Sequence, residues 1–118
     1  MESQIQLKYE DVAAKPNAKK VYFIGDLDAT NVETVLEHIF NLLAEGYIHI
    51  VADFSKLRYV NSTGLGILLH FSKLAKEKGG SFKIACINEN VYEIIEIIGA
   101  TTLLEIYDDA EVAVASLQ

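Results

Sequence analysis

The stretch "YVNSTGLGILLHFSKLAKEKGG", residues 59–80, joins an apolar run to a segment with helical periodicity. Its start, Asn-Ser-Thr at positions 61–63, favours a helix N-terminus because these side-chain oxygens accept hydrogen bonds from free backbone N–H groups. Gly64 and Gly66 follow, although a glycine inside a helix costs about 1 kcal/mol relative to alanine. The two glycines therefore predict a place where something approaches the backbone closely.

The rest of the chain alternates predicted strands with predicted helices. Strands are expected over residues 4–11, 19–25, 47–54, 81–87 and 102–108, and helices over 29–45, from the quoted stretch to about 78, over 88–99 and over 108–117. The helix over 88–99 is expected to have Val91, Ile94, Ile95 and Ile98 on one face. A short connection predicts an antiparallel hairpin of the first two strands, and the intervening helices predict parallel pairing of the others. The pattern predicts one α/β domain over residues 1–118, with a mixed, mainly parallel sheet, an N-terminal hairpin and about four helices.

Composition is that of a globular protein, with 118 residues, 51% hydrophobic and 23% charged. No apolar run approaches the roughly 18 residues that span a bilayer, and the N-terminus lacks the pattern of a signal peptide. The single cysteine, Cys86, cannot form an internal disulfide and is expected to pack. We therefore expect a cytoplasmic protein without membrane insertion.

The net charge of −7 argues against direct binding of nucleic acid, which requires clustered lysine and arginine. No basic residue follows Lys83, whereas seven acidic residues do: Glu89, Glu93, Glu96, Glu105, Asp108, Asp109 and Glu111. This acidic segment is either a solvated face or a surface for a basic protein partner.

Functional residues of open α/β sheets gather beyond the carboxyl ends of the parallel strands. The loop after residues 47–54 is the favoured place, and Ser62 is expected there at the positive end of a helix, a position that suits a phosphate. Asp26 and Asp28 follow the second strand and should reach the same edge. These two acids serve either as helix-capping, solvated groups or as a catalytic dyad.

The sequence contains no complete motif for a nucleotide-binding, hydrolase or metal site. The run "GLGILL" lacks the third glycine of a dinucleotide fingerprint, and neither a P-loop nor a G-x-S-x-G elbow is present. His38, His49 and His70 fall on separate predicted elements, which favours packing or exposure over a metal site or a triad. No cofactor and no metal are expected, and the chain is not expected to be an enzyme.

The segment "VADFSKLRYVNSTGLGILLHFSKLAKEKGG" resembles the signature of STAS domains, especially of bacterial anti-sigma factor antagonists. That pattern runs hydrophobic-D-hydrophobic-S, then after a short gap D-S-[ST]-G-L. "FIGDLDATN" resembles the family's G-x-L-D loop, and the segment from residue 82 onward resembles its closing strand, helix, strand and helix. The resemblance covers nearly the whole chain and implies a STAS-type fold.

The resemblance implies a phosphorylation switch on Ser62. In such proteins the partner is an anti-sigma factor that is also a serine kinase, binding ATP or ADP, and the unmodified antagonist releases sigma factor from it. Asp28, Thr63 and Gly64 match the family pattern, whereas Asn61 stands where the pattern has Asp. Asn keeps an acceptor but lacks the charge, which bears on recognition by the kinase. A phosphatase is a further implied partner.

The predicted partner surface comprises Asp26, Asp28, Asn61, Ser62, Thr63, Gly64 and Gly66. Two other hypotheses stay open from the sequence. The chain could serve as a non-phosphorylated STAS scaffold or transport-system subunit, to which Asn61 lends weight. It could instead bind or convert a small molecule with Asp26, Asp28 and Ser62. The pathway and the oligomeric state do not follow from the sequence.

Overall fold

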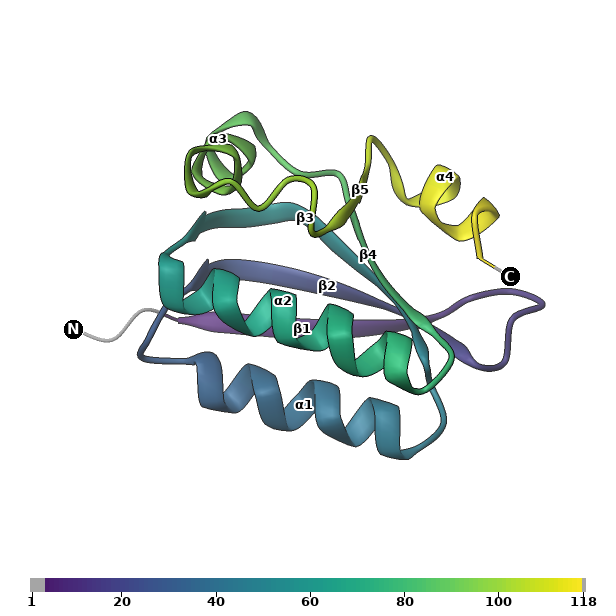
Figure 1. Cartoon of the computed structure of the whole chain (residues 1–118). Helices are drawn as coiled ribbons and strands as arrows, with labels where there is room; N and C mark the ends of the chain where they lie inside the picture. Colours follow the sequence, from purple (N-terminus) through teal and green to yellow (C-terminus); the bar gives the residue numbers. More distant parts are fainter. Residues whose placement is uncertain (1–3, 118) are drawn as a thin grey trace.

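The computed structural model describes residues 4–117. Five strands and four helices are found in this part of the chain: β1 (Ile5–Asp11), β2 (Ala18–Leu27), α1 (Val32–Ala44), β3 (His49–Val60), α2 (Ser62–Glu77), β4 (Ser81–Ala85), α3 (Glu89–Ile98), β5 (Glu105–Tyr107) and α4 (Ala110–Ala115). The strands form one sheet in sequence order, with β1 antiparallel to β2 and all other pairs parallel (Figure 1). The α/β class, the hairpin and the mainly parallel sheet are thereby confirmed.

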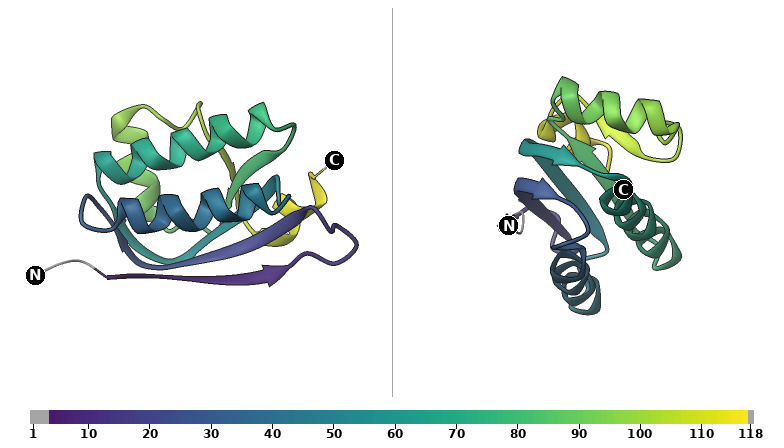
Figure 2. Two further views of the ribbon diagram at one scale, coloured as in Figure 1. Left: turned by 90° about the horizontal axis from the view of Figure 1, so that it is seen from below. Right: turned by 90° about the vertical axis from the view of Figure 1, so that its left-hand side faces the viewer.

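The helices cover the two faces of the sheet unequally. α1 and α2 lie side by side over one face (Figure 2), and with α3 they enclose the main core, in which Phe54 and Phe71 are fully buried. α4 packs on the opposite face, where Val51 and Ala85 meet Ala113 in a smaller cluster. No helix within residues 4–117 is long and apolar enough to cross a membrane.

α2 follows the prediction from its apolar spacing. Leu65, Leu68, Phe71 and Ala75 recur every three or four residues and are buried against the sheet. Gly79, with φ +82°, follows the helix in a left-handed conformation that favours glycine. Gly80 then passes so close to β3 that a Cβ atom would overlap the carbonyl oxygen of Ile48. These two glycines turn the chain from α2 into β4.

The sequence predicts that the third strand ends at Phe54, but β3 continues for six more residues to Val60. Its pairing with β2 shifts register twice, between Tyr22 and Ile24 and between Gly25 and Asp26, and each time β3 contributes one extra residue. The shifts bury every third residue of its second half instead of every second one. The predicted loop after Phe54 is therefore wrong, since its residues are strand.

Other boundaries differ by a few residues. α1 begins at Val32 rather than at residue 29, because residues 28–31 form a hydrogen-bonded turn. β4 ends at Ala85, where Cys86 adopts a φ of +61° that a strand cannot contain. β5 has three residues instead of the seven expected.

Burial raises the pKa of the Cys86 thiol, with a smaller contribution from Asp53, which agrees with packing rather than reactivity.

α3 departs from the prediction in its packing. Val91 and Ile95 are buried as expected, and Ile94 is half-buried. Ile98, predicted on the same face, is 48% exposed, and its neighbour Ile97 is 76% exposed. The helix therefore leaves apolar side chains at its C-terminal end uncovered.

Candidate functional site

The carboxyl ends of β2 and β3 meet at one edge, which we call the carboxyl rim and define as residues 26–28 and 58–66. Leu27 pairs with Val60, and the backbone N–H of Asn61 donates to the carbonyl oxygen of Leu27 at 3.2 Å. Residue 28 thus lies next to the start of α2. The prediction that the loop acids and the Ser62 segment share one edge is confirmed at the level of the backbone.

Asn61 is the N-cap of α2. Its backbone is extended, with φ −95° and ψ −179°, and its Oδ1 accepts a hydrogen bond from the Gly64 N–H at 2.8 Å. Ser62 is consequently the first helical residue and is exposed. Because the Asn61 side chain caps the helix, the Ser62 hydroxyl is not needed as the cap. Ser62 lies at the positive end of the helix dipole.

Thr63 is exposed like Ser62. Of the two hydroxyl residues, Ser62 is the one that the resemblance to the STAS signature predicts to be modified. Exposure therefore does not distinguish them, and the assignment of Ser62 rests on its place in the motif.

The two glycines of α2 differ in environment. Gly64 is buried, and a Cβ atom there would lie 2.8 Å from the carbonyl oxygen of Leu27 and 2.9 Å from Cγ2 of Val60. Its missing side chain lets α2 start directly against the ends of β2 and β3. Gly66 is exposed, and a Cβ atom added there would have no described neighbour within 4 Å outside its own helix turn. The close approach predicted from the sequence is internal at Gly64, whereas Gly66 is open to solvent.

Asp26 belongs to β2 rather than to a loop. Its carboxylate pairs with Arg58, with 3.4 Å between Oδ1 and Nε, and its carbonyl oxygen accepts from Nδ2 of Asn31 at 2.8 Å. Arg58 and the 47% exposed Tyr59 lie on the carboxyl rim but are missing from the predicted site. Both fall in the predicted loop favoured for function, but nothing in the sequence singles out either side chain within it.

Asp28 organises the turn before α1. Its carboxylate accepts from the Thr30 N–H at 2.9 Å and from the Thr30 hydroxyl at 2.6 Å, and its own N–H donates to Oδ1 of Asn31 at 3.1 Å. The Asp26 carboxylate thus pairs with Arg58 and the Asp28 carboxylate with Thr30, whereas Asn31 bonds to the backbone of both residues. This geometry is that of a structured turn beside an ion pair, and it favours a structural role for the two acids over a catalytic dyad.

The histidines lie at separate places, each beside a residue of another element: His38 by Tyr9, His49 by Ser81 and His70 by Phe40. Burial, together with the nearby charges of Lys83 and Lys15, lowers the pKa of His49. Within residues 4–117 no group of three or more His, Cys, Asp or Glu side chains could hold a metal ion.

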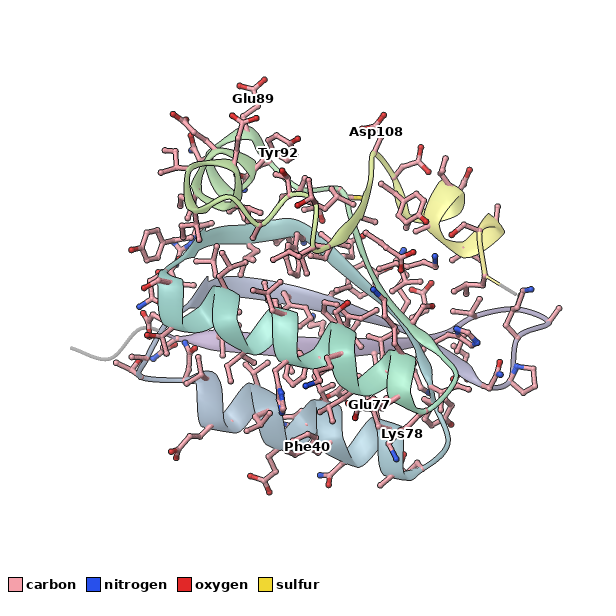
Figure 3. The ribbon with its side chains drawn as sticks, in the orientation of Figure 1. Phe40, Glu77, Lys78, Glu89, Tyr92 and Asp108 are labelled. Atoms are coloured by element: carbon pink, nitrogen blue, oxygen red, sulfur yellow. The ribbon has the colours of Figure 1, made fainter. Side chains whose placement is uncertain are left out.

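The acidic segment after Lys83 is largely solvated. Six of its seven acids are exposed, and Glu105 instead lies 3.5 Å from Nζ of Lys83. Figure 3 shows Glu89 on α3 and Asp108 before α4 projecting away from the sheet. The start of α3, with Glu89, lies beside the carboxyl rim, because Nδ2 of Asn88 donates to the carbonyl oxygen of Leu57, the residue before Arg58.

Known proteins resemble this chain over most of its length. It is 31% identical to the anti-sigma F factor antagonist of Paenibacillus polymyxa over 70 residues, which are 59% of this chain and 60% of the relative. It is 26% identical to the anti-sigma-B factor antagonist of Bacillus subtilis over 101 residues, 86% of this chain and 92% of the relative.

Solved structures share the fold. An anti-sigma factor antagonist from Mycobacterium paratuberculosis superposes with a TM-score of 0.83 at 19% identity, over 97% of this chain and 94% of the other. The phosphorylated form of SpoIIAA, a Bacillus cell fate determinant, gives 0.67 at 17% identity, over 91% and 96%. The sequence model of the STAS domain matches residues 9–113. The chain therefore belongs to the STAS domain family.

Proposed function

We propose that this chain is an anti-sigma factor antagonist, a non-enzymatic regulator that acts in the cytoplasm and is switched off by phosphorylation of Ser62. One observation carries the proposal: the hydroxyl of Ser62 is exposed at the first helical position of α2, while Asn61 makes the cap. The relatives named as anti-sigma factor antagonists and the neighbour solved in a phosphorylated form support it.

The fold should tolerate the modification. A phosphate adds about −1.5 to −2 charges, and the N-terminus of α2 stabilises negative charge in its first turn. α2 has no acidic residue in that turn, so a phosphate on Ser62 meets no carboxylate of the same helix turn. The modified domain should therefore stay folded.

The phosphate should weaken binding of the partner rather than destabilise the fold. In the unmodified protein a partner covers an uncharged hydroxyl together with exposed Thr63 and Gly66. After phosphorylation the same contact must desolvate a dianion against a surface fitted to a hydroxyl. A penalty of about 3 kcal/mol would weaken binding more than a hundredfold.

The remaining rim residues have distinct roles in this proposal. Tyr59 offers an exposed ring on the carboxyl rim, and Arg58 holds the Asp26 carboxylate in place. Asp28 orders the loop that faces the start of α2. Asn61 and Gly64 have structural roles: Asn61 caps α2, and Gly64 lets α2 pack against β2 and β3.

A kinase assay tests the proposal. The purified chain is incubated with ATP and a candidate anti-sigma factor kinase from the same organism, and the phosphopeptides are mapped. We expect phosphate on Ser62, none in Ser62→Ala, and normal incorporation in the matched control Thr63→Ala. Phosphate on Thr63 alone, or none in a kinase preparation that modifies its own control substrate, contradicts the assignment.

A further inference from the structure

The second half of α2 and the loop after α3 form an apolar groove outside the carboxyl rim. The groove is lined by Leu69, Ser72, Lys73, Lys76, Glu77 and Leu103, and has a volume of about 590 Å³. Leu103 is 59% exposed, although leucine is among the residues most often buried in globular proteins. Leu69 lies seven residues, about 10 Å of helix rise, after Ser62.

α3, which precedes Leu103 in the sequence, exposes a second apolar surface. Ile97 is 76% exposed and Ile98 48% exposed, and only four residues separate Ile98 from Leu103. A turn closed by the hydrogen bond from the Leu103 N–H to the Ala100 carbonyl oxygen connects them. Clustered exposed side chains of this size mark interaction sites in soluble proteins.

The two surfaces carry opposite charges. The groove has Lys73 and Lys76 on its α2 side against one acid, Glu77, and among the described residues 4–117 neither lysine takes part in an ion pair. The exposed face of α3 has Glu93 and Glu96 beside Ile97. A copy of the chain therefore presents both a lysine-edged apolar groove and an acid-edged apolar ridge.

The spacings on the two helices match. On α2, Lys73 follows Leu69 by four residues, and on α3, Glu93 precedes Ile97 by four residues. Four residues correspond to one turn, about 6 Å, on one face of each helix. When α3 of one copy lies antiparallel to α2 of another, Ile97 enters the groove beside Leu69 while Glu93 reaches Lys73.

We infer that this face binds a second copy of the chain, forming a two-fold dimer in which each α3 docks against the other copy's α2. Two-fold symmetry makes the contact reciprocal, so both grooves are filled and the assembly closes. The contact goes beyond the proposed function, because it uses the second half of α2 and leaves the Ser62 hydroxyl outside the interface.

Sedimentation velocity of the full chain over a range of concentrations tests the dimer. We expect concentration-dependent dimerisation that Ile97→Glu abolishes, and that Lys73→Glu and Glu93→Lys each weaken at least tenfold. The double variant Lys73→Glu/Glu93→Lys restores the opposite charges and should recover dimerisation. Lys56→Glu, an exposed lysine of β3 away from the groove, is the matched control and should leave the dimer unchanged.

The result can overturn the inference in three ways. A chain that stays monomeric at millimolar concentration has no such dimer. A dimer that survives Ile97→Glu, or that the charge swap does not rescue, uses another face. A monomer in which Ile97→Glu instead weakens binding of the anti-sigma factor assigns the face to that partner. Loss of phosphorylation in Ser62→Ala leaves the dimer untouched, so failure of either proposal is recognised separately.

Discussion

The two ends of β3 are built in opposite ways. At its amino end the strand pairs with β4 without a break, with His49 opposite Ser81, and Gly80 is pressed against the backbone of Ile48. At its carboxyl end two register shifts loosen the pairing with β2, and the chain opens into the exposed rim that carries Ser62. The amino end is closely packed, whereas the carboxyl end is the one that binds the partner in the proposed function. Changes at the two ends should therefore separate into effects on stability and effects on binding.

The largest effect is expected for charge at position 62. Ser62→Glu should lower affinity for the anti-sigma factor about a hundredfold, because a carboxylate must be desolvated in the interface. Ser62→Ala should bind like the unmodified protein. Since Asn61 provides the cap, both variants should unfold within about 1 kcal/mol of the parent. Calorimetric titration with thermal melts measures both, and a Glu variant that binds normally would remove Ser62 from the interface.

Gly80→Ala tests the other end. Its Cβ would overlap the Ile48 carbonyl oxygen, a backbone atom that cannot turn away, so unfolding free energy should fall by about 1–3 kcal/mol. Gly66→Ala is the matched control: its Cβ would meet no described atom outside its own helix turn, and the alanine should stabilise α2 by up to about 1 kcal/mol. Urea denaturation compares them. Equal stability of the two alanine variants would show that the amino end is not tightly packed.

Asn61 sharpens the comparison within the rim. Asn61→Ala removes the hydrogen bond to the Gly64 N–H and should cost about 1 kcal/mol. Asn61→Asp keeps the acceptor, adds a charge favoured at a helix N-terminus by about 0.3–1 kcal/mol, and restores the residue of the family pattern. Its melting temperature should equal or exceed that of the parent, with kinase recognition retained. If Asp destabilised α2 as much as Ala does, the cap geometry described for Asn61 would be wrong.

The smallest effect is a pH dependence at the amino end. Burial and the charges of Lys83 and Lys15 lower the pKa of His49 in the fold, so below about pH 6.5 the unfolded chain binds more protons than the native one. The stability that neutral His49 contributes above that pH is therefore lost as the pH falls through its folded pKa. His49→Gln should flatten the melting temperature between about pH 7 and 5 relative to the parent. Parallel curves for the two proteins would contradict this.

Periodicity predicts the order of elements but not where β3 ends. The first half of this strand has the apolar character of a buried parallel strand, which the sequence shows directly. Its second half buries Leu57 and Val60 at a spacing of three, because each bulge adds one residue against β2. A sequence contains no local mark of such a bulge, since the extra residue depends on the partner strand. The ladder that pairs Tyr59 with Asp26 could not be predicted for this reason.

The candidate site is predicted by motif more than by environment. The motif indicates Ser62, and the carboxyl-edge rule places Asp28 near it. Neither could tell that Gly64 serves internal packing while Gly66 is open, because that difference depends on Leu27 and Val60 from two other elements. The prediction for Ile98 fails in the same way: its helical spacing is right, but no element within residues 4–117 packs over the end of α3 to bury it.

Binding of the anti-sigma factor by the same preparation before and after phosphorylation tests the central claim most directly. The protein is titrated calorimetrically into the ADP-bound anti-sigma factor, then phosphorylated, mapped to Ser62 and titrated again, with thermal melts of both forms. We predict that the unmodified form binds, that the phosphorylated form loses more than a hundredfold in affinity, and that both melt as folded proteins. Equal affinity of the two forms would contradict the switch at Ser62.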